Sequence, residues 1–186
     1  MIDTLAIKKY YLRYWVDRSQ AARKAAEELA NKEVALSLND RYKEEGLVFT
    51  LDGHKVEFKG ENEKNLNDTK YNLFTYDEAM ECFGKPDEGG WRLPTKKELG
   101  TLCNYSYKFD DNSSQGIFDY RLYLPVAGYR YCDGDVGDVG SYGCYWSSTP
   151  DGLGSAWYLN LDSDQVDMYS VYRCNGQSVR LVRDVK

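Results

Sequence analysis

The stretch SAWYLNLDSDQVDMYS (155–170) contains two segments in which apolar and polar side chains alternate. In its first half, Trp157 and Leu159 alternate with Tyr158 and Asn160. Successive side chains of a β-strand point to opposite faces of a sheet. The pattern therefore predicts a strand that buries its tryptophan and leucines and turns its tyrosine and asparagine outward.

The second half of this stretch repeats the pattern. Val166 and Met168 are expected to face the core, and Asp167 and Tyr169 the solvent. Near the end of the chain, SVRLVRD (178–184) is typical of a closing strand. These segments predict a twisted antiparallel sheet with long loops.

Two helices are predicted ahead of the sheet by the sequences TYDE (75–78) and TKKE (95–98), each with a glutamate three residues after a threonine. In this capping box the threonine hydroxyl and the glutamate carboxylate satisfy amides of the first turn. We expect short helices at about 76–83 and 96–103. Helices beside an antiparallel sheet indicate an α+β domain.

The beginning of the chain has a different character. From residue 4 to about residue 45 alanines and leucines recur at helical spacing, and Asp52-Gly53 then lies between two β-rich runs. An Asp-Gly pair in that setting predicts a tight hairpin. We expect an N-terminal helical segment at 1–46 and the main domain at 47–186.

The charge of the chain limits its partners. The net charge is −6, and the sequence has no block of basic residues. A protein that binds nucleic acid through phosphate contacts needs such a block, so this class is not expected. No apolar run approaches the length that spans a membrane.

The five cysteines are widely spaced, odd in number and without a CxxC pair, which disfavours a structural zinc site. The first residues also lack the apolar core of a signal peptide. These features predict free thiols in a protein made in the cytoplasm. The cysteines are Cys82, Cys103, Cys132, Cys144 and Cys174.

The only histidine, His54, adjoins the predicted hairpin turn. A Ser-His-Asp or Cys-His catalytic group would therefore depend on a residue in an exposed hairpin. This placement disfavours such a mechanism.

Lysine and glutamate are unevenly distributed. Residues 1–108 contain 13 Lys and 12 Glu, whereas residues 109–185 contain neither. Aspartate remains common in the later part, so a requirement for solubility does not explain the difference. A glycine-rich sheet that avoids long charged side chains is the alternative explanation.

The same region is rich in Tyr, Ser, Gly and Asp, the composition of antibody-like binding surfaces, in which tyrosine supplies contact area at a small entropic cost. Residues 129–175 contain seven Asp and two Arg, which gives this stretch a net charge of −5. The expected ligand therefore carries basic or hydrogen-bond-donating groups. The candidate anchors are Tyr131, Tyr142, Tyr158, Tyr169 and Tyr172.

Several motifs between residues 70 and 185 carry a family resemblance in combination. They are GGWRLPTKKEL (89–99), LPVAGYR (124–130), YWSST (145–149), AWYLNL (156–161) and NGQSVRLVRD (175–184). Together they resemble the C-type lectin-like fold of bacterial and phage proteins, most closely the target proteins of diversity-generating retroelements. Relatives of that fold include the formylglycine-generating enzymes.

The resemblance implies that error-prone reverse transcription replaces adenines in the 3′ part of the gene. Asn-type codons can then yield Tyr, Asp, Ser, Gly, Cys and others, but never Lys, Glu, Gln, Met or Trp, which fits the observed asymmetry. Frame residues are of the excluded types, and two of them, Trp146 and Trp157, are expected in the core. The frame set is Trp146, Trp157, Gln165, Met168 and Gln177.

The implied diversified region is about 129–175, and its candidate ligand-binding residues are expected to form one solvent-facing patch, in which exposed cysteines would be by-products of the codon set. The candidates are Tyr131, Cys132, Asp133, Asp135, Tyr142, Cys144, Tyr158, Asn160, Asp164, Asp167, Tyr169, Ser170, Tyr172 and Cys174.

The expected function is non-enzymatic binding of a protein or cell-surface ligand, without a cofactor, in a receptor-binding module that is assembled into a phage virion or displayed on a cell. One alternative is a formylglycine-generating-like oxidase with a copper-binding pair among Cys132, Cys144 and Cys174. Another is a purely structural phage or surface domain. Calcium-dependent sugar binding is disfavoured, because the Glu-Pro-Asn and Gln-Pro-Asp motifs are missing. Ligand identity and oligomeric state stay open.

Overall fold

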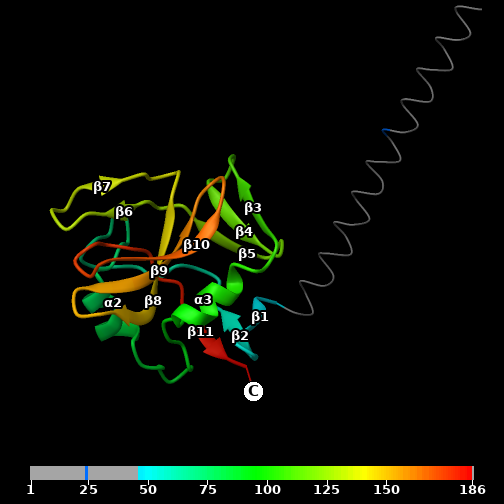
Figure 1. The fold of residues 1–186 in the computed structure, drawn as a ribbon, viewed down its shortest axis with the longest axis horizontal. Helices are drawn as coiled ribbons and strands as arrows, with labels where there is room; N and C mark the ends of the chain where they lie inside the picture. The colour runs from blue at the N-terminus through cyan, green and yellow to red at the C-terminus, as the bar shows by residue number, and fades with distance from the viewer. Residues whose placement is uncertain (1–23, 25–45, 186) are drawn as a thin grey trace, which may run out of the picture. The chain divides into compact units, whose positions relative to one another are not determined.

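The computed structural model describes residue 24 and residues 46–185 (Figure 1). The helical segment predicted for residues 1–46 falls almost entirely outside them, so that segment and its boundary stay predictions. No helix in the described part of the chain is long and apolar enough to cross a membrane.

The helices predicted at about 76–83 and 96–103 are both confirmed, as α2 (Tyr76–Phe83) and α3 (Lys96–Leu102). In each capping box the threonine side chain accepts a hydrogen bond from the glutamate backbone N–H. The glutamate carboxylate accepts one from the threonine N–H in return, at 2.8 Å in α2 and 2.6 Å in α3. Local sequence therefore sets where each helix begins.

The predicted hairpin is also confirmed. β1 (Val48–Leu51) and β2 (His54–Phe58) are antiparallel and joined by two residues, Asp52 at φ 47° and Gly53 at φ 84°. Two successive left-handed residues make the type I′ turn that matches the twist of a hairpin. β11 (Val182–Asp184) pairs with β2, so the end of the chain closes the sheet begun by the hairpin.

The stretch at 155–170 forms two strands of a second antiparallel sheet, in the order β10-β9-β8. These strands are β8 (Gly143–Asp151), β9 (Ser155–Leu161) and β10 (Val166–Tyr172). Tyr158 pairs with Tyr169, so both lie on the same face of the sheet. The alternation in the sequence thus predicts correctly which side chains share a face. The expected outward exposure is wrong for two of them, because Tyr158 packs against a hydrophobic core and Asn160 is only 6% exposed.

The remaining strands form a three-stranded sheet, β3-β4-β5, and a two-stranded ribbon, β6-β7. They are β3 (Tyr107–Asp110), β4 (Gln115–Phe118), β5 (Leu122–Pro125), β6 (Tyr129–Arg130) and β7 (Val136–Gly137). The domain is α+β and mostly antiparallel, as expected. However, the described strands form several small sheets rather than one, and Gly128 (φ 73°) lies at the turn between β5 and β6, which belong to different sheets.

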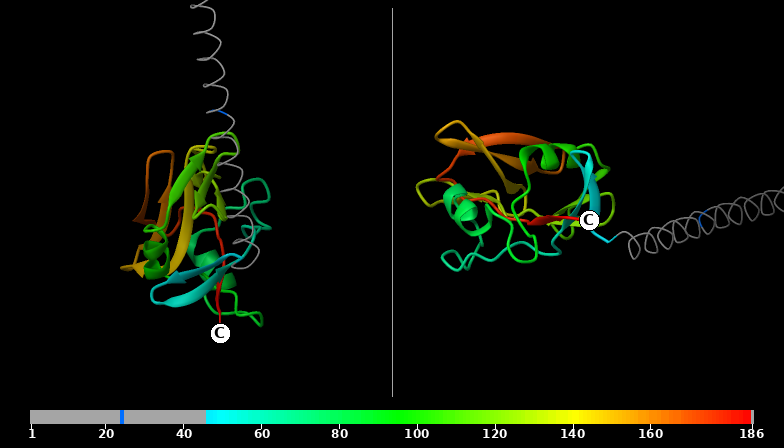
Figure 2. Two further views of the ribbon diagram at one scale, coloured as in Figure 1. Left: turned by 90° about the vertical axis from the view of Figure 1, so that its right-hand side faces the viewer. Right: turned by 90° about the horizontal axis from the view of Figure 1, so that it is seen from below.

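β8 lies between two hydrophobic cores, and its consecutive residues Tyr145 and Trp146 point into different ones. The first core joins α3 to β1, β2, β9 and β11, and the second joins α2 to β8 and the segment before β11 (Figures 1 and 2). Both rings are fully buried, at 1% and 0% exposure. The predicted burial of Trp146 is confirmed.

Trp157 is only partly buried, so its assignment to the core was too strong. It lies near the start of β9 on the same face as Leu159, which is buried. The ammonium of Lys96, at the first position of α3, lies 3.0 Å from the centre of its ring. The side chain that covers the indole ring is thus cationic rather than apolar, and the ring stays partly exposed.

Candidate functional site

A pocket of about 580 Å³ opens on one face of the β8–β10 sheet. Its floor consists of outward-facing side chains of these three strands: Cys144, Tyr158, Asn160, Tyr169 and Val171. Cys144 is paired with Asn160 across β8 and β9, and Tyr158 with Tyr169 across β9 and β10. The face predicted to point away from the core therefore forms the floor of the pocket.

Tyr158 connects this floor to the frame. Its ring packs edge-on against Trp146, with centroids 6.2 Å apart, and lies 6.4 Å from the ring of Tyr169. Burial raises the pKa of Tyr158 to about 12. The hydroxyl therefore stays protonated at neutral pH and can donate a hydrogen bond.

The β6–β7 ribbon and the turn after it form the wall, through Tyr129, Tyr131, Asp138 and Tyr142. The Tyr129 and Tyr131 hydroxyls lie 2.8 Å apart, and Tyr129 donates to Asp138 Oδ2 at 2.8 Å. The hydrogen bond with Tyr131, burial and the Asp138 carboxylate all raise the pKa of Tyr129. The wall is thus an aromatic pair joined to a carboxylate.

Backbone pairing holds the wall against the segment that precedes β11. Arg130 N–H donates to Gly176 O at 2.9 Å, and Gly176 N–H donates to Arg130 O at 2.8 Å. A Cβ at Gly176 would lie 3.0 Å from the Arg130 side chain, so the close approach favours glycine. The Arg130 guanidinium also donates to Asp68 at 2.8 Å.

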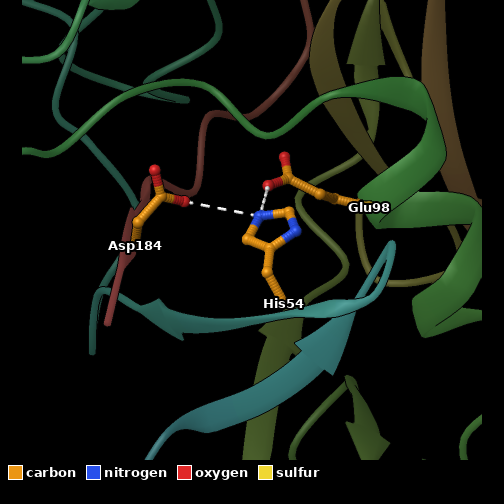
Figure 3. A group of neighbouring side chains, drawn as sticks. All are labelled: His54, Glu98 and Asp184. Atoms are coloured by element: carbon orange, nitrogen blue, oxygen red, sulfur yellow. Dashed lines mark hydrogen bonds and ion pairs between the residues drawn. The ribbon is translucent and has the colours of Figure 1, made fainter. Parts of the chain in front are cut away.

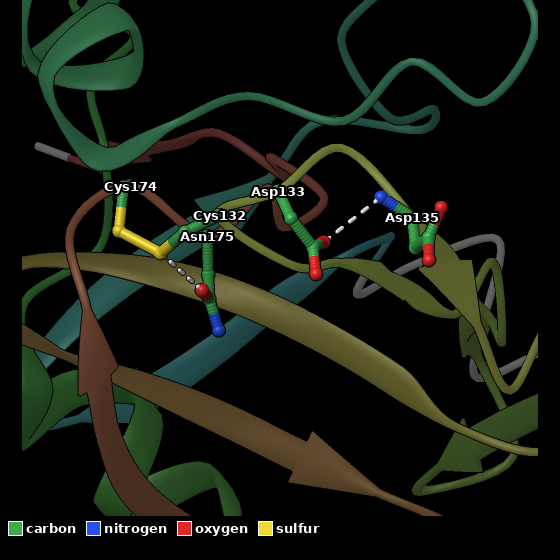
Figure 4. The surroundings of a disulfide bond; sticks show 5 residues. All are labelled: Cys132, Asp133, Asp135, Cys174 and Asn175. Atoms are coloured by element: carbon green, nitrogen blue, oxygen red, sulfur yellow. Dashed lines mark hydrogen bonds between the residues drawn. A yellow bond between two sulfur atoms is a disulfide. The ribbon is translucent and has the colours of Figure 1, made fainter.

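Cys132 and Cys174 form a disulfide beside Asn175 (Figure 4). Because Asn175 lines the pocket, we describe this disulfide as the rim of the pocket. This corrects the prediction of five free thiols, which now holds for Cys82, Cys103 and Cys144. Residue 130 pairs with residue 176 in antiparallel orientation, so residue 132 lies opposite residue 174. The Cα atoms of the two cysteines are 5.0 Å apart. An odd cysteine count carries no information about such long-range proximity.

The remaining lining residues are Gln165, in the turn between β9 and β10, and Asn175 and Gln177, in the segment before β11. Gln177 is 1% exposed, and its side-chain oxygen has no hydrogen-bond partner in the described part of the chain. Asn175 Oδ1 lies 3.0 Å from Cys132 Sγ. Both glutamines belong to the predicted frame, so frame residues also line the pocket.

A model of the Lcl C-terminal domain family matches residues 45–183, about three quarters of the chain. The chain belongs to the Lcl C-terminal domain family. Searches of curated proteins and of solved structures gave no significant match.

The family model covers the motifs on which the resemblance rests, except the last residue of the final one, Asp184. In this Lcl C-terminal domain, those motifs supply pocket residues such as Tyr129 and Gln177 and core residues such as Trp146. The match supports the family, and the C-type lectin-like classification goes beyond it.

Six of the predicted site residues line the pocket of this Lcl C-terminal domain: Tyr131, Tyr142, Cys144, Tyr158, Asn160 and Tyr169. Cys144 is 2% exposed and Asn160 6%, so these two lie deeper than the solvent-facing patch that was expected. Their side chains are in contact, with Cys144 Sγ 3.5 Å from Asn160 Oδ1.

The other predicted site residues lie outside the pocket lining. Asp133 and Asp135 lie in the exposed turn of the β6–β7 ribbon (Figure 4), and Asp164 in the turn between β9 and β10. Asp167 shares the pocket-facing register of β10 without lining the pocket. Cys132 and Cys174 form the disulfide at the rim.

Two further candidates on β10 point the other way. Ser170 pairs with Trp157, and Tyr172 pairs with Ser155, so both lie on the face opposite to Tyr169. The single patch proposed to include Tyr172 is therefore wrong in that part. Composition identifies binding-type residues, but the register decides which of them meet.

Six lining residues were missing from the predicted set. Two of them could have been found from sequence. Tyr129 is two residues from Tyr131, and Val171 is two residues from Tyr169, so in a strand each would share a face with a predicted site residue. For Asp138 and Gln177 the sequence holds no comparable signal, because a ribbon and a C-terminal segment bring them to the sheet from a distance. The six are Tyr129, Asp138, Gln165, Val171, Asn175 and Gln177.

A second cluster surrounds the only histidine, where His54 Nε2 lies 3.1 Å from Glu98 and 3.4 Å from Asp184 (Figure 3). Arg92 already provides a cation here, because its Nη2 lies 2.7 Å from both carboxylates. Burial opposes ionisation of Glu98, but hydrogen bonds from Arg92 and Thr95 prevail and lower its pKa. The cluster is a network of ion pairs that links β2, α3 and β11.

Proposed function

We propose that this Lcl C-terminal domain is a non-enzymatic ligand-binding protein of the retroelement-diversified type, with a C-type lectin-like fold. Its pocket and rim would bind a protein or cell-surface receptor. The ligand would change as adenine-directed mutagenesis changes the lining. The proposal places the protein on a phage virion or a cell surface.

One observation carries the proposal: the tyrosine-rich lining coincides with the stretch that contains no lysine or glutamate. Nine of the twelve lining residues are Tyr, Asp, Asn or Cys, types that Asn-type codons contain or can yield. Tyr158, one of them, packs against Trp146, which such codons cannot yield and which is fully buried. A variable lining on an invariant support is the arrangement that diversified binding requires.

The chemistry of the cysteines also favours binding over oxidation. Cys144 is the free cysteine in the pocket, and burial raises its pKa to about 12, which disfavours the reactive thiolate. Cys132 and Cys174 are bonded to each other. An oxidase of the formylglycine-generating type would use a pair of free thiols, so copper binding and turnover by the reduced protein would revive that alternative.

The binding site can be tested with two display libraries of the full chain. One library replaces Tyr131, Tyr142 and Tyr169 with the set of residues that an Asn codon yields. The control library does the same at exposed positions away from the pocket, Lys55 and Glu81. Selection against a panel of purified proteins should give specific binders mainly from the first library, and equal frequencies would refute the pocket as the site.

The diversification mechanism has a separate test. A reverse transcriptase gene and a near-copy of the 3′ end of this gene should lie nearby in the genome. Adenines in that copy should correspond to the variable positions. Their absence would refute the retroelement part of the proposal and leave the binding part standing.

A further inference from the structure

Five tyrosines enclose the pocket from two sides. Tyr129, Tyr131 and Tyr142 come from the wall, and Tyr158 and Tyr169 from the floor. The face of an aromatic ring carries partial negative charge and attracts a cation placed over it. The same rings offer apolar surface to an alkyl chain.

The pocket also offers hydrogen-bond acceptors that need donors. The Asp138 carboxylate accepts a hydrogen bond from Tyr129 and has further acceptor capacity. The side-chain oxygen of Gln177 is buried and has no partner in the described part of the chain. A buried acceptor without a partner is unfavourable, and an N–H group from a ligand would relieve the penalty.

The negative charge of Asp138 is not neutralised by the lining, because none of the lining residues is Lys or Arg. The two arginines within residues 129–177, the stretch that contains the lining, pair elsewhere. Arg130 binds Asp68 at 2.8 Å, and Arg173 contacts Asp77 on α2. The pocket therefore combines a carboxylate, a buried acceptor and aromatic faces without an internal cation.

We infer that the pocket takes a primary alkylammonium group, such as the side chain of a lysine on a protein partner. This inference rests on the proposed binding function and names the chemistry of the ligand. A primary ammonium has three N–H donors for Asp138 and Gln177, whereas a quaternary ammonium has none. The volume of about 580 Å³ lies within the range of pockets that enclose small ligands and is ample for a lysine side chain.

The inference can be tested by calorimetric titration of the full chain with three capped amino acids. These are Nα-acetyl-lysine N-methylamide, the neutral norleucine analogue and the Nε-trimethyl-lysine analogue. The lysine probe should bind about tenfold more tightly than norleucine, because it adds charge and N–H donors to the same alkyl stem. Its affinity should fall as salt rises from low to physiological concentration.

Substitutions should assign the selectivity to particular atoms. Asp138→Asn should weaken binding of the lysine probe about tenfold and leave norleucine unchanged. Asparagine also tolerates the left-handed backbone at this position (φ 55°), so the fold should persist. Asp151→Asn, at the exposed end of β8 outside the pocket, is the matched control and should change nothing.

A second variant addresses the buried acceptor. Gln177→Met keeps the approximate volume and removes the acceptor, so it should weaken the lysine probe and spare the trimethyl-lysine probe. Its thermal midpoint should be measured first. If Gln177→Met does not fold, the comparison of lysine with trimethyl-lysine on the unmodified protein tests the same point.

The inference is overturned if the lysine probe fails to bind, or if norleucine or trimethyl-lysine binds equally well. It is also overturned if Asp138→Asn has no effect. If uncharged ligands bind to the unmodified protein and no longer bind to the Tyr169→Ala variant, the pocket is the binding site and only the ammonium preference is refuted. Failure of the pocket library to yield binders would instead refute the proposed function.

Discussion

Reducing the Cys132–Cys174 disulfide should destabilise the domain by about 4 kcal/mol. The bond joins positions 42 residues apart. In the chain-entropy model, a closed loop of about that length removes about 13 cal/mol/K from the unfolded chain, which gives about 4 kcal/mol at 25 °C. Backbone hydrogen bonds between Arg130 and Gly176 hold the same segments in the native state. They do not constrain the unfolded chain, so they cannot replace this effect.

The assay is urea denaturation of the oxidised and reduced protein, preceded by a thiol count under denaturing conditions. The isolated protein should show three free thiols, and five after reduction. In the double variant Cys132→Ser, Cys174→Ser, reductant should leave the midpoint unchanged. Five thiols in the unreduced protein would refute the bond, and equal midpoints of the two forms would refute the loop-entropy reasoning.

Three further predictions concern the burial and pairing of particular side chains. Trp146→Ala should lower the free energy of unfolding by about 3–5 kcal/mol, and Trp157→Ala by only about 1–2 kcal/mol, because one ring is fully buried and the other lies partly exposed under a lysine. Equal shifts in urea denaturation would contradict this difference. The exposed thiol of Cys82 should react with Ellman's reagent at pH 8 at least about tenfold faster than that of Cys144, whose pKa burial raises to about 12; similar rates would argue against the burial of Cys144. Burial raises the pKa of Glu98, but hydrogen bonds lower it by more, so its pKa lies below the ordinary value. Glu98→Gln should therefore lower the free energy of unfolding by about 3 kcal/mol at pH 7. The difference in unfolding free energy between the two proteins should shrink as the pH falls below 4.5 and through the lowered pKa of Glu98. Urea denaturation from pH 7 to pH 2 measures it, and a difference that stays constant would contradict this prediction.

The parts of the fold that were predictable from sequence depend on neighbours in the chain. The capping boxes need only two residues three positions apart, and the hairpin turn needs only Asp52 and Gly53. Strand facing at 155–170 follows from a period of two. These signals are local, so the structure confirms them almost residue by residue.

The pocket was predictable only in part, because its wall and floor come from segments that meet over long sequence distances. Composition pointed to tyrosines as ligand-binding residues, and Tyr169 and Tyr158 do line the pocket. Composition could not exclude Tyr172, which differs from Tyr169 only in which face of β10 it occupies. Nor could it reveal Asp138 or Gln177, which reach the site through the pairing of the ribbon with the segment before β11.

The structure also limits how freely a diversified lining can vary. Tyr131, Tyr142 and Tyr169 are 38–45% exposed, so replacing them leaves little buried volume unfilled. Cys144 and Asn160 are almost fully buried, and a larger or charged residue at either position would meet a packed sheet or an unpaired buried group. Codon chemistry would offer the same residue types at all five positions, but folding would accept them unequally. Functional variety in such a pocket would therefore come mainly from its exposed tyrosines, and Cys144 and Asn160 would keep a narrower set of side chains.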